Sequence, residues 1–270
     1  MAEPFIIMCA PNGARKTQTD HPALPITPVE LADCAESILD AGASLIHIHV
    51  RDDAGGHSLD VDRYRDAARA IKERVGDRLV AQVTTEACGI YSTEQQMAMV
   101  RELKPEAVSL ALKELCPDEK AEVIAASFFS WLRRERIMAQ HILYSPDEVR
   151  RFEALRSRGI FGDEEPMVLY VLGRFASNLT GNVDDLDAFV QASSVQTGWA
   201  MCCFGATEHQ AAQKSAAMGG HARVGFENNL LLPDGSLAEN NATLVGMAAD
   251  AGRAESRSPA LASDVRNAFN

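Results

Sequence analysis

Short apolar runs alternate with capped amphipathic helices along the whole chain, and this pattern repeats eight times. The runs have the length of buried β-strands, and helix signals such as the capping box Thr27-Pro28-Val29-Glu30 follow them. The expected strands are 5–10, 44–52, 79–84, 107–112, 137–143, 167–172, 198–204 and 222–226. The expected helices are 27–42, 60–76, 92–103, 117–135, 145–159, 183–193, 207–219 and 241–251, with a short one at 261–268.

Strict alternation of this kind favours a parallel sheet with right-handed crossovers. Eight units in about 250 residues predict an α/β fold, a single (β/α)8 TIM barrel over residues 1–270 with a C-terminal helical extension. The alternative is an open doubly wound sheet, which would carry a glycine-rich Gly-x-Gly-x-x-Gly turn after its first strand. Residues 12–15, Asn-Gly-Ala-Arg, do not supply that turn.

The strand expected at 44–52 carries two histidines two residues apart. Because side chains alternate along a strand, His47 and His49 point to the same face, and the apolar Ile46 and Ile48 point to the other. Two imidazoles one pleat apart can bind one metal ion. The alternative is a pair of buried histidines that donate to nearby carbonyl groups.

The last expected strand continues toward a glutamate that could complete such a site. Alternation points Arg223, Gly225 and Glu227 into the barrel. This strand and the histidine strand both neighbour the first strand, so they lie about 10 Å apart. Two histidines and one carboxylate form a catalytic set for Zn²⁺ or another divalent metal. An ion pair of Glu227 with Arg51 or Arg223 is the alternative.

Other inward positions suit a substrate pocket, because barrel chemistry lies at the C-terminal ends of the strands. Thr84 and Ser109 point inward by parity. On the fifth strand either Gln140 or His141 does so, and we keep His141 as the substrate-binding candidate. His221 lies at the opposite end and is expected to be structural. His57 and His209 are expected to be exposed to solvent, and the box 207–210 is expected to be helix punctuation.

The net charge of −12 argues against binding to nucleic acid or to an anionic membrane surface. The six cysteines include no Cys-x-x-Cys pair and mostly occupy apolar segments, which indicates buried thiols in a reducing compartment. The N-terminus has no signal-peptide pattern, and no run approaches the roughly 20 apolar residues of a membrane span. We therefore expect a cytoplasmic protein.

Several segments together resemble the β-keto acid cleavage enzymes, whose founding activity is 3-keto-5-aminohexanoate cleavage. They are Pro11-Asn12-Gly13-Ala14, Leu24-Pro25-Ile26-Thr27-Pro28-Val29-Glu30, Ala41-Gly42-Ala43, His47-Ile48-His49-Val50-Arg51-Asp52 and Arg223-Val224-Gly225-Phe226-Glu227-Asn228-Asn229. The similarity runs from the first strand to the end of the eighth, and the combination of the last two segments is specific.

The resemblance implies a zinc-dependent enzyme that condenses a β-keto acid with acetyl-CoA, giving acetoacetate and a new acyl-CoA. His47, His49 and Glu227 would hold the metal, and Arg223 would bind beside the reacting carboxylate and ketone. The resemblance also implies association into a homo-oligomer. Helix faces rich in Ala and Leu agree with this, and we expect a tetramer.

The sequence departs from the family in four places. The strand-four Asn of the family falls at Ala111, and the acid often found after Gly-Ala in the first loop is Arg15. The family has an acid directly after the metal-binding glutamate, and this chain has Asn228 there, a catalytic position that cannot accept a proton. The family segment Ser-Thr-Gly-Gly is replaced by residues 84–87, which place the charge of Glu86 at the substrate. A base must therefore come from a hydroxide on the metal, from His141 or from Glu86. The alternatives for function are an aldolase or lyase without CoA and a non-catalytic metal-bound binding protein.

Overall fold

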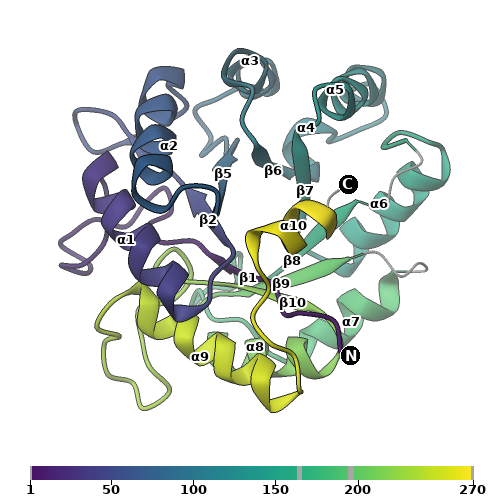
Figure 1. Ribbon diagram of the computed structural model, residues 1–270. Helices are drawn as coiled ribbons and strands as arrows, with labels where there is room; N and C mark the ends of the chain where they lie inside the picture. Colours follow the sequence, from purple (N-terminus) through teal and green to yellow (C-terminus); the bar gives the residue numbers. More distant parts are fainter. Residues whose placement is uncertain (1, 163–165, 194–197, 269–270) are drawn as a thin grey trace.

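In the computed structural model, which describes residues 2–162, 166–193 and 198–268, eight parallel strands form a closed barrel (Figure 1). Going round the barrel from the first strand to its other neighbour, the strands are β1 (Ile7–Cys9), β10 (His221–Val224), β9 (Trp199–Cys203), β8 (Met167–Leu172), β7 (Met138–Leu143), β6 (Ala107–Ala111), β5 (Val80–Thr84) and β2 (Leu45–Ile48). The predicted (β/α)8 barrel is confirmed, and β2 and β10 both pair with β1 as expected.

Helices surround the barrel and cover its outer face (Figure 1). They are α1 (Pro28–Ala41), α2 (Val61–Val75), α3 (Thr93–Leu103), α4 (Leu112–Leu115), α5 (Glu122–Arg134), α6 (Pro146–Ser157), α7 (Asp185–Ala192), α8 (Glu208–Ala217) and α9 (Asn241–Ala254). A further helix, α10 (Ala262–Ala268), lies across one end of the barrel (Figure 1). The Thr27 capping box forms as predicted, with the Thr27 hydroxyl accepting from Glu30 N and the Glu30 carboxylate accepting from Thr27 N.

The structure corrects three local predictions. The strand expected at 44–52 breaks after Ile48, and β3 (Val50–Arg51) instead pairs antiparallel with β4 (His57–Ser58). The last strand ends at Val224, because Gly225 has a φ of +128° and turns the chain. The capping box expected at 207–210 does not form: the Thr207 hydroxyl donates to Gly181 O rather than capping α8.

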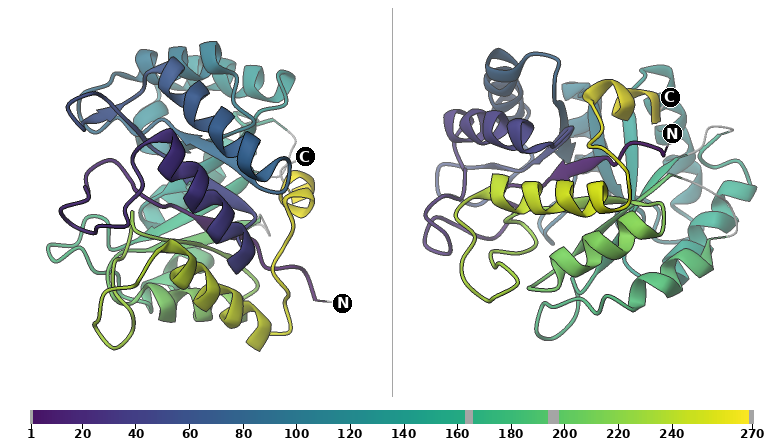
Figure 2. Two further views of the ribbon diagram at one scale, coloured as in Figure 1. Left: turned by 60° about the vertical axis from the view of Figure 1, so that its left-hand side comes forward. Right: turned by 60° about the horizontal axis from the view of Figure 1, so that its bottom comes forward.

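Two apolar layers hold the barrel together. The outer layer lies between strands and helices, where Ile46, Val108 and Tyr170 pack against the surrounding helices. The inner layer lies inside the barrel, and the C-terminal segment joins it at the N-terminal end through Ala262 and Val265 of α10. Figure 2 shows the yellow α10 and the N-terminus at one end of the barrel, with long loops at the opposite end.

All six cysteines are free thiols, as the sequence predicted. None of the helices in the described residues is long and apolar enough to cross a membrane.

Candidate active site

The two histidines of the motif face each other inside the C-terminal end of the barrel. His47 lies on β2, His49 follows it, and their Nε2 atoms are 3.2 Å apart. His47 Nδ1 donates to the Gln82 side-chain oxygen at 2.8 Å, which leaves the lone pair of His47 on Nε2. Burial lowers the pKa of His47 to about 3, so its imidazole is neutral and able to act as a ligand at neutral pH.

Asn12 fixes the backbone of the second histidine, a role that the sequence reasoning missed. Its Nδ2 donates to His49 O at 2.9 Å, and its Oδ1 accepts from His49 N at 3.3 Å. The same amide nitrogen donates to Pro25 O at 3.0 Å, so one buried asparagine joins three loop segments. Its place in the resembling segment 11–14 was the available signal.

Glu227 brings a carboxylate to the two imidazoles, from the turn after β10 rather than from a continued strand. Its Oε2 lies 3.3 Å from His49 Nε2 and 3.6 Å from His47 Nε2. Burial works to raise the pKa of Glu227, but Arg223 and His49 beside it hold that pKa well below its usual range. The carboxylate is therefore ionised when it meets the histidines.

The donor set fits one divalent metal ion. Four ligands at about 2.0–2.1 Å in a tetrahedron lie about 3.3 Å from one another. The distances among the three candidate atoms, 3.2, 3.3 and 3.6 Å, are close to that spacing. Glu227 Oε2 is buried and has no hydrogen-bond partner among the described residues, so a cation here would satisfy it.

Arg223 lies beside this set, and Asn228 contacts it. Arg223 Nη2 contacts Glu227 Oε1 at 3.1 Å and donates to Asn228 Oδ1 at 3.3 Å. The alternative expected for Glu227, an ion pair with Arg223, is therefore present together with the histidine contacts. Arg51 instead donates to backbone oxygens, including Lys16 O at 2.8 Å.

The structure brings Thr84, Ser109 and Glu86 to the same end of the barrel. Thr84 pairs in register with Ser109, whose buried hydroxyl has no partner among the described residues. Glu86 Oε2 lies 3.9 Å from His49 Nδ1, and its Oε1 accepts from Arg15 at 2.8 Å. Burial works to raise the pKa of Glu86, but His49 and Arg15 outweigh it and hold that pKa below its ordinary value.

His141 does not belong to this site, and its prediction as a substrate-binding residue is wrong. Gln140 points inward and accepts from Gln82 Nε2 at 3.2 Å. The pleat therefore turns His141 outward, where its ring lies 5.2 Å from Phe129, 4.7 Å from Phe161 and 5.3 Å from Phe152.

His57 is also misplaced by the sequence reasoning: it is buried rather than solvent-exposed, with 7% of its surface accessible. Its Nε2 donates to Glu86 O at 2.8 Å, and its ring centroid lies 5.3 Å from that of His49. It supports the loop that carries Glu86. His221 is buried at the other end of the barrel, where its Nδ1 accepts from Ile6 N at 3.1 Å, in agreement with a structural role.

Glu208 is a buried carboxylic acid next to Asn228, and sequence reasoning had assigned it to helix punctuation. It is the first residue of α8, and its Oε1 accepts from Asn228 Nδ2 at 3.3 Å and from Gly225 N at 3.1 Å. Burial raises the pKa of Glu208 to about 8. The only sequence signal was an acid in a segment read as a capping box.

A cavity of about 390 Å³ opens above the site between the loops. Glu227, Asn228 and Glu86 line its inner part. Three cations, Arg15, Lys16 and Arg174, and the apolar side chains Leu179, Phe204, Leu230, Leu231 and Leu237 line the rest. Lys16 Nζ donates to Glu227 O at 2.6 Å. The mouth thus combines positive charge with an apolar wall.

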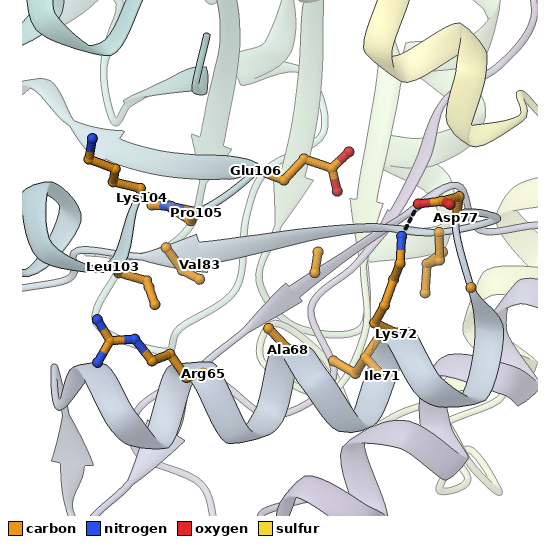
Figure 3. A pocket seen from close by; sticks show the side chains of 13 residues that line it. Arg65, Ala68, Ile71, Lys72, Asp77, Val83, Leu103, Lys104, Pro105 and Glu106 are labelled. Atoms are coloured by element: carbon orange, nitrogen blue, oxygen red, sulfur yellow. Dashed lines mark hydrogen bonds and ion pairs between the residues drawn. The ribbon is translucent and has the colours of Figure 1, made fainter. Parts of the chain in front are cut away.

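A second cavity of about 330 Å³ lies on the outer side of the barrel wall, between α2 and the segment that leads into β6 (Figure 3). Arg65, Ala68 and Ile71 of α2 face Val83 and Leu103 across it. It contains none of the site residues predicted from the sequence and is separate from the cavity at the mouth of the barrel.

Comparisons with known proteins agree with this geometry. The family model for "beta-keto acid cleavage enzyme" matches residues 4–270. The chain is 31% identical over 251 residues to a 3-keto-5-aminohexanoate cleavage enzyme of Fusobacterium nucleatum subsp. nucleatum, covering 91% of this chain and 90% of that one. It is 26% identical over 265 residues to a 3-oxoadipate:acetyl-CoA acetyltransferase of Cupriavidus necator, covering 92% and 88%.

Among solved structures, an apo structure of ObcA has a TM-score of 0.71 at 16% identity, covering 92% of this chain and 65% of that one. The chain thus spans about two thirds of the length of ObcA. At this identity the likeness shows a shared fold.

Proposed function

The chain belongs to the beta-keto acid cleavage enzyme family, and we propose that it condenses a β-keto acid with acetyl-CoA to give acetoacetate and a new acyl-CoA. The observation that carries this proposal is the meeting of His47, His49 and Glu227 beside Arg223 at the mouth of the barrel. Relatives named as acetyl-CoA transferases support acetyl-CoA as the second substrate.

The reaction exchanges acyl partners without net oxidation. The C2 carbon of the keto acid loses a proton and attacks the thioester carbonyl, releasing CoA as a thiolate. The thiolate then attacks the original C3 ketone, and cleavage of the C2–C3 bond forms the new acyl-CoA. Reprotonation of the remaining carbanion gives acetoacetate.

We propose zinc as the resident metal, held by His47, His49 and Glu227 with an open position. Nitrogen and carboxylate donors at this spacing support zinc, although other divalent ions accept the same donors. When bound, the ion would polarise the ketone and so acidify the adjacent C–H bond.

Arg223 would bind the substrate carboxylate. Its guanidinium is buried, cannot lose its charge, and pairs with Glu227 in the structure. An arriving carboxylate can take the same guanidinium in a forked contact. The neighbouring Thr84 and Ser109 would line the pocket for the keto acid, and the unpartnered Ser109 hydroxyl supports this role.

Glu86 would accept the proton from C2. Asn228 cannot accept a proton, and His141, one of the three bases expected from the sequence, packs outside the barrel. Glu86 stands at the mouth 3.9 Å from His49 and is ionised at neutral pH, which supports it as the acceptor.

Acetyl-CoA would enter over Arg15, Lys16 and Arg174. Three cations in one cavity suit the phosphates of CoA, and Leu179 and Phe204 offer apolar contact to the rest of the molecule. The carboxylate of Glu86 neutralises part of this charge in the free enzyme, through Arg15 at 2.8 Å and Arg174 at 3.5 Å.

The test is a screen of metal-replete protein against a panel of β-keto acids, with and without acetyl-CoA, read by mass spectrometry of acyl-CoA products. Formation of acetoacetate and a new acyl-CoA only when acetyl-CoA is present supports the proposal. Cleavage without acetyl-CoA would identify an aldolase or lyase. Binding without turnover across the panel would identify a binding protein.

We also propose a homo-oligomer, with a tetramer as the expected state. Val123 and Ile124 on α5 are 79% and 59% exposed, and such adjacent apolar side chains support a helix face that another copy covers. Sedimentation at micromolar concentration tests this, and a monomer there would contradict it.

A further inference from the structure

Glu208 is a buried acid that the proposed reaction does not use. Only 2% of its surface is exposed, and no basic side chain forms an ion pair with it in the parts of the chain that the structure describes. A buried carboxyl group without a cation is costly unless hydrogen bonds satisfy it. The hydrogen bonds of Glu208 therefore indicate its structural role.

Those hydrogen bonds point to the Asn228 amide. Glu208 Oε1 accepts from Asn228 Nδ2 at 3.3 Å, and Arg223 O accepts from the same nitrogen at 3.2 Å. With its nitrogen held by two acceptors, the amide must direct Oδ1 the other way. There it accepts from Arg223 Nη2 at 3.3 Å and from Cys202 Sγ at 3.2 Å.

An amide has one donor end and one acceptor end, so its orientation matters to the arginine. Reversed, Asn228 would present N–H groups to the guanidinium, which can only donate. A carboxylate at the same position would present an acceptor oxygen in either orientation. An asparagine beside Arg223 thus needs a second group that fixes its orientation, and Glu208 is placed to supply it.

We propose that Glu208 is a positioning residue: it fixes the Asn228 amide, which in turn holds Arg223 toward the substrate carboxylate. Glu208 and Asn228 together then hold Arg223 in place, which one acid next to the metal-binding glutamate could do alone. This inference rests on the proposed function for its kinetic test, because the effect is expected in kcat.

The contacts continue from Glu208 to the candidate metal ligands. Glu208 contacts Asn228, Asn228 contacts Arg223, and Arg223 Nη2 reaches Glu227 Oε1 at 3.1 Å. Glu208 Oε1 also accepts from Gly225 N at 3.1 Å and so holds the turn that carries Glu227. One carboxyl group therefore supports both the orientation of the arginine and the start of the turn.

The first experiment compares kcat and KM of metal-replete Glu208→Leu and Glu208→Gln with the wild type. Glu208→Leu removes the acceptor, so kcat should fall about 10- to 100-fold, in the range found for residues that orient metal-site groups. Glu208→Gln keeps an acceptor oxygen and should retain most of kcat. KM for acetyl-CoA should stay near the wild-type value in both, because Glu208 does not line the mouth.

The second experiment adds Asn228→Asp to each background. In the wild type Glu208 is a neutral acid at neutral pH, because burial raises its pKa to about 8, so its hydroxyl can donate to the new carboxylate and kcat should change little. In Glu208→Leu the same change should raise kcat, because a carboxylate needs no orienting partner. A gain in kcat confined to the Glu208→Leu background is the expected result.

The control is Gln213→Ala, an exposed position on the same helix. It should match the wild type in kcat and zinc content. The inference is overturned if Glu208→Gln is as impaired as Glu208→Leu, if Glu208→Leu keeps full activity, or if Asn228→Asp fails to raise kcat in the Glu208→Leu background.

A crystal structure separates this inference from the proposed function. If the wild type turns over no β-keto acid, the proposed function fails. The position of Arg223 in a Glu208→Leu crystal structure still shows whether Glu208 positions this arginine. A displaced or doubled Arg223 side chain supports positioning by Glu208. An Arg223 side chain that superposes on that of the wild type overturns it.

Discussion

At the scale of single residues, the site depends on which ring nitrogen of each histidine is free. Gln82 accepts the Nδ1 hydrogen of His47, so Nε2 points at the centre with its lone pair available. We expect His47→Ala and His49→Ala each to lose stoichiometric zinc, as measured by elemental analysis after dialysis. His209→Ala, on a partly exposed surface of α8, is the matched control and should keep it. Zinc retained by the double variant His47→Ala/His49→Ala would rule this site out.

Arg223 tests the need for a forked cation. Arg223→Lys keeps a positive charge beside Glu227 but cannot make two parallel hydrogen bonds to a carboxylate. We expect normal folding and zinc content with kcat/KM for the keto acid lowered about 100-fold, a loss of about 2.7 kcal/mol. A lysine variant with full activity would show that charge alone suffices.

His141 should affect stability at acidic pH. Burial lowers its pKa in the folded state to about 3, below the unfolded value of about 6.5. As the pH falls from 6.5 toward 3, only the unfolded chain takes up this proton, so stability falls; above 6.5 there is no effect. Between pH 7 and pH 5 the expected loss from His141 is about 2 kcal/mol. Urea unfolding at both pH values should show that His141→Phe loses less stability than the wild type over this interval.

At the scale of elements, the loop after β1 packs against the turn after β10. A Cβ on Gly13 would lie 2.6 Å from Glu227 Cγ, so Gly13→Ala must push the carboxylate aside. Gly76 also has a φ of +64° but has nothing within 4 Å, so Gly76→Ala places a side chain on positive-φ backbone without any such contact. Both variants should lose about 1–2 kcal/mol of stability, but only Gly13→Ala should weaken zinc binding, by about tenfold or more. Equal zinc affinity in the two variants would contradict the contact.

Element patterns also explain which predictions held. Parity placed Thr84, Ser109 and Arg223 inside the barrel, because regular strands alternate. Parity also pointed Glu227 inward, but the expected continuous strand is not what brings it there, because Glu227 reaches the histidines from a turn that Gly225 creates. Parity could not choose between Gln140 and His141, because that choice depends on the register with neighbouring strands.

Glu208 and Asn12 show the other limit of sequence reasoning. Their partners lie 20 and 37 residues away along the chain, and no local pattern joins them. Eight strand–helix repeats predict a closed barrel without such pairs. The polar contacts that orient a site can be identified only from the three-dimensional structure.

At the scale of the whole molecule, function and stability lie at opposite ends of the barrel. Val265 of α10 is fully buried in the inner apolar layer at the N-terminal end. We expect Val265→Ala to lower the free energy of unfolding by about 2 kcal/mol and to leave kcat and zinc content unchanged. Urea denaturation and steady-state kinetics on the same preparation check both parts. A parallel loss of kcat under native conditions would show that the two ends are coupled.

The filled N-terminal end of the barrel affects the order in which substrates bind and products leave. Among residues 2–162, 166–193 and 198–268, apolar side chains and α10 pack against the N-terminal end of the barrel, and the site opens to the cavity at the mouth. The small keto acid must reach the candidate metal ligands inside the barrel, and the much larger thioester then occupies the mouth above it. We therefore expect an ordered mechanism. The keto acid binds before acetyl-CoA, the new acyl-CoA leaves first, and acetoacetate leaves last. Acetoacetate should then compete with the keto acid for the free enzyme, whereas a dead-end CoA thioether should trap the keto acid inside.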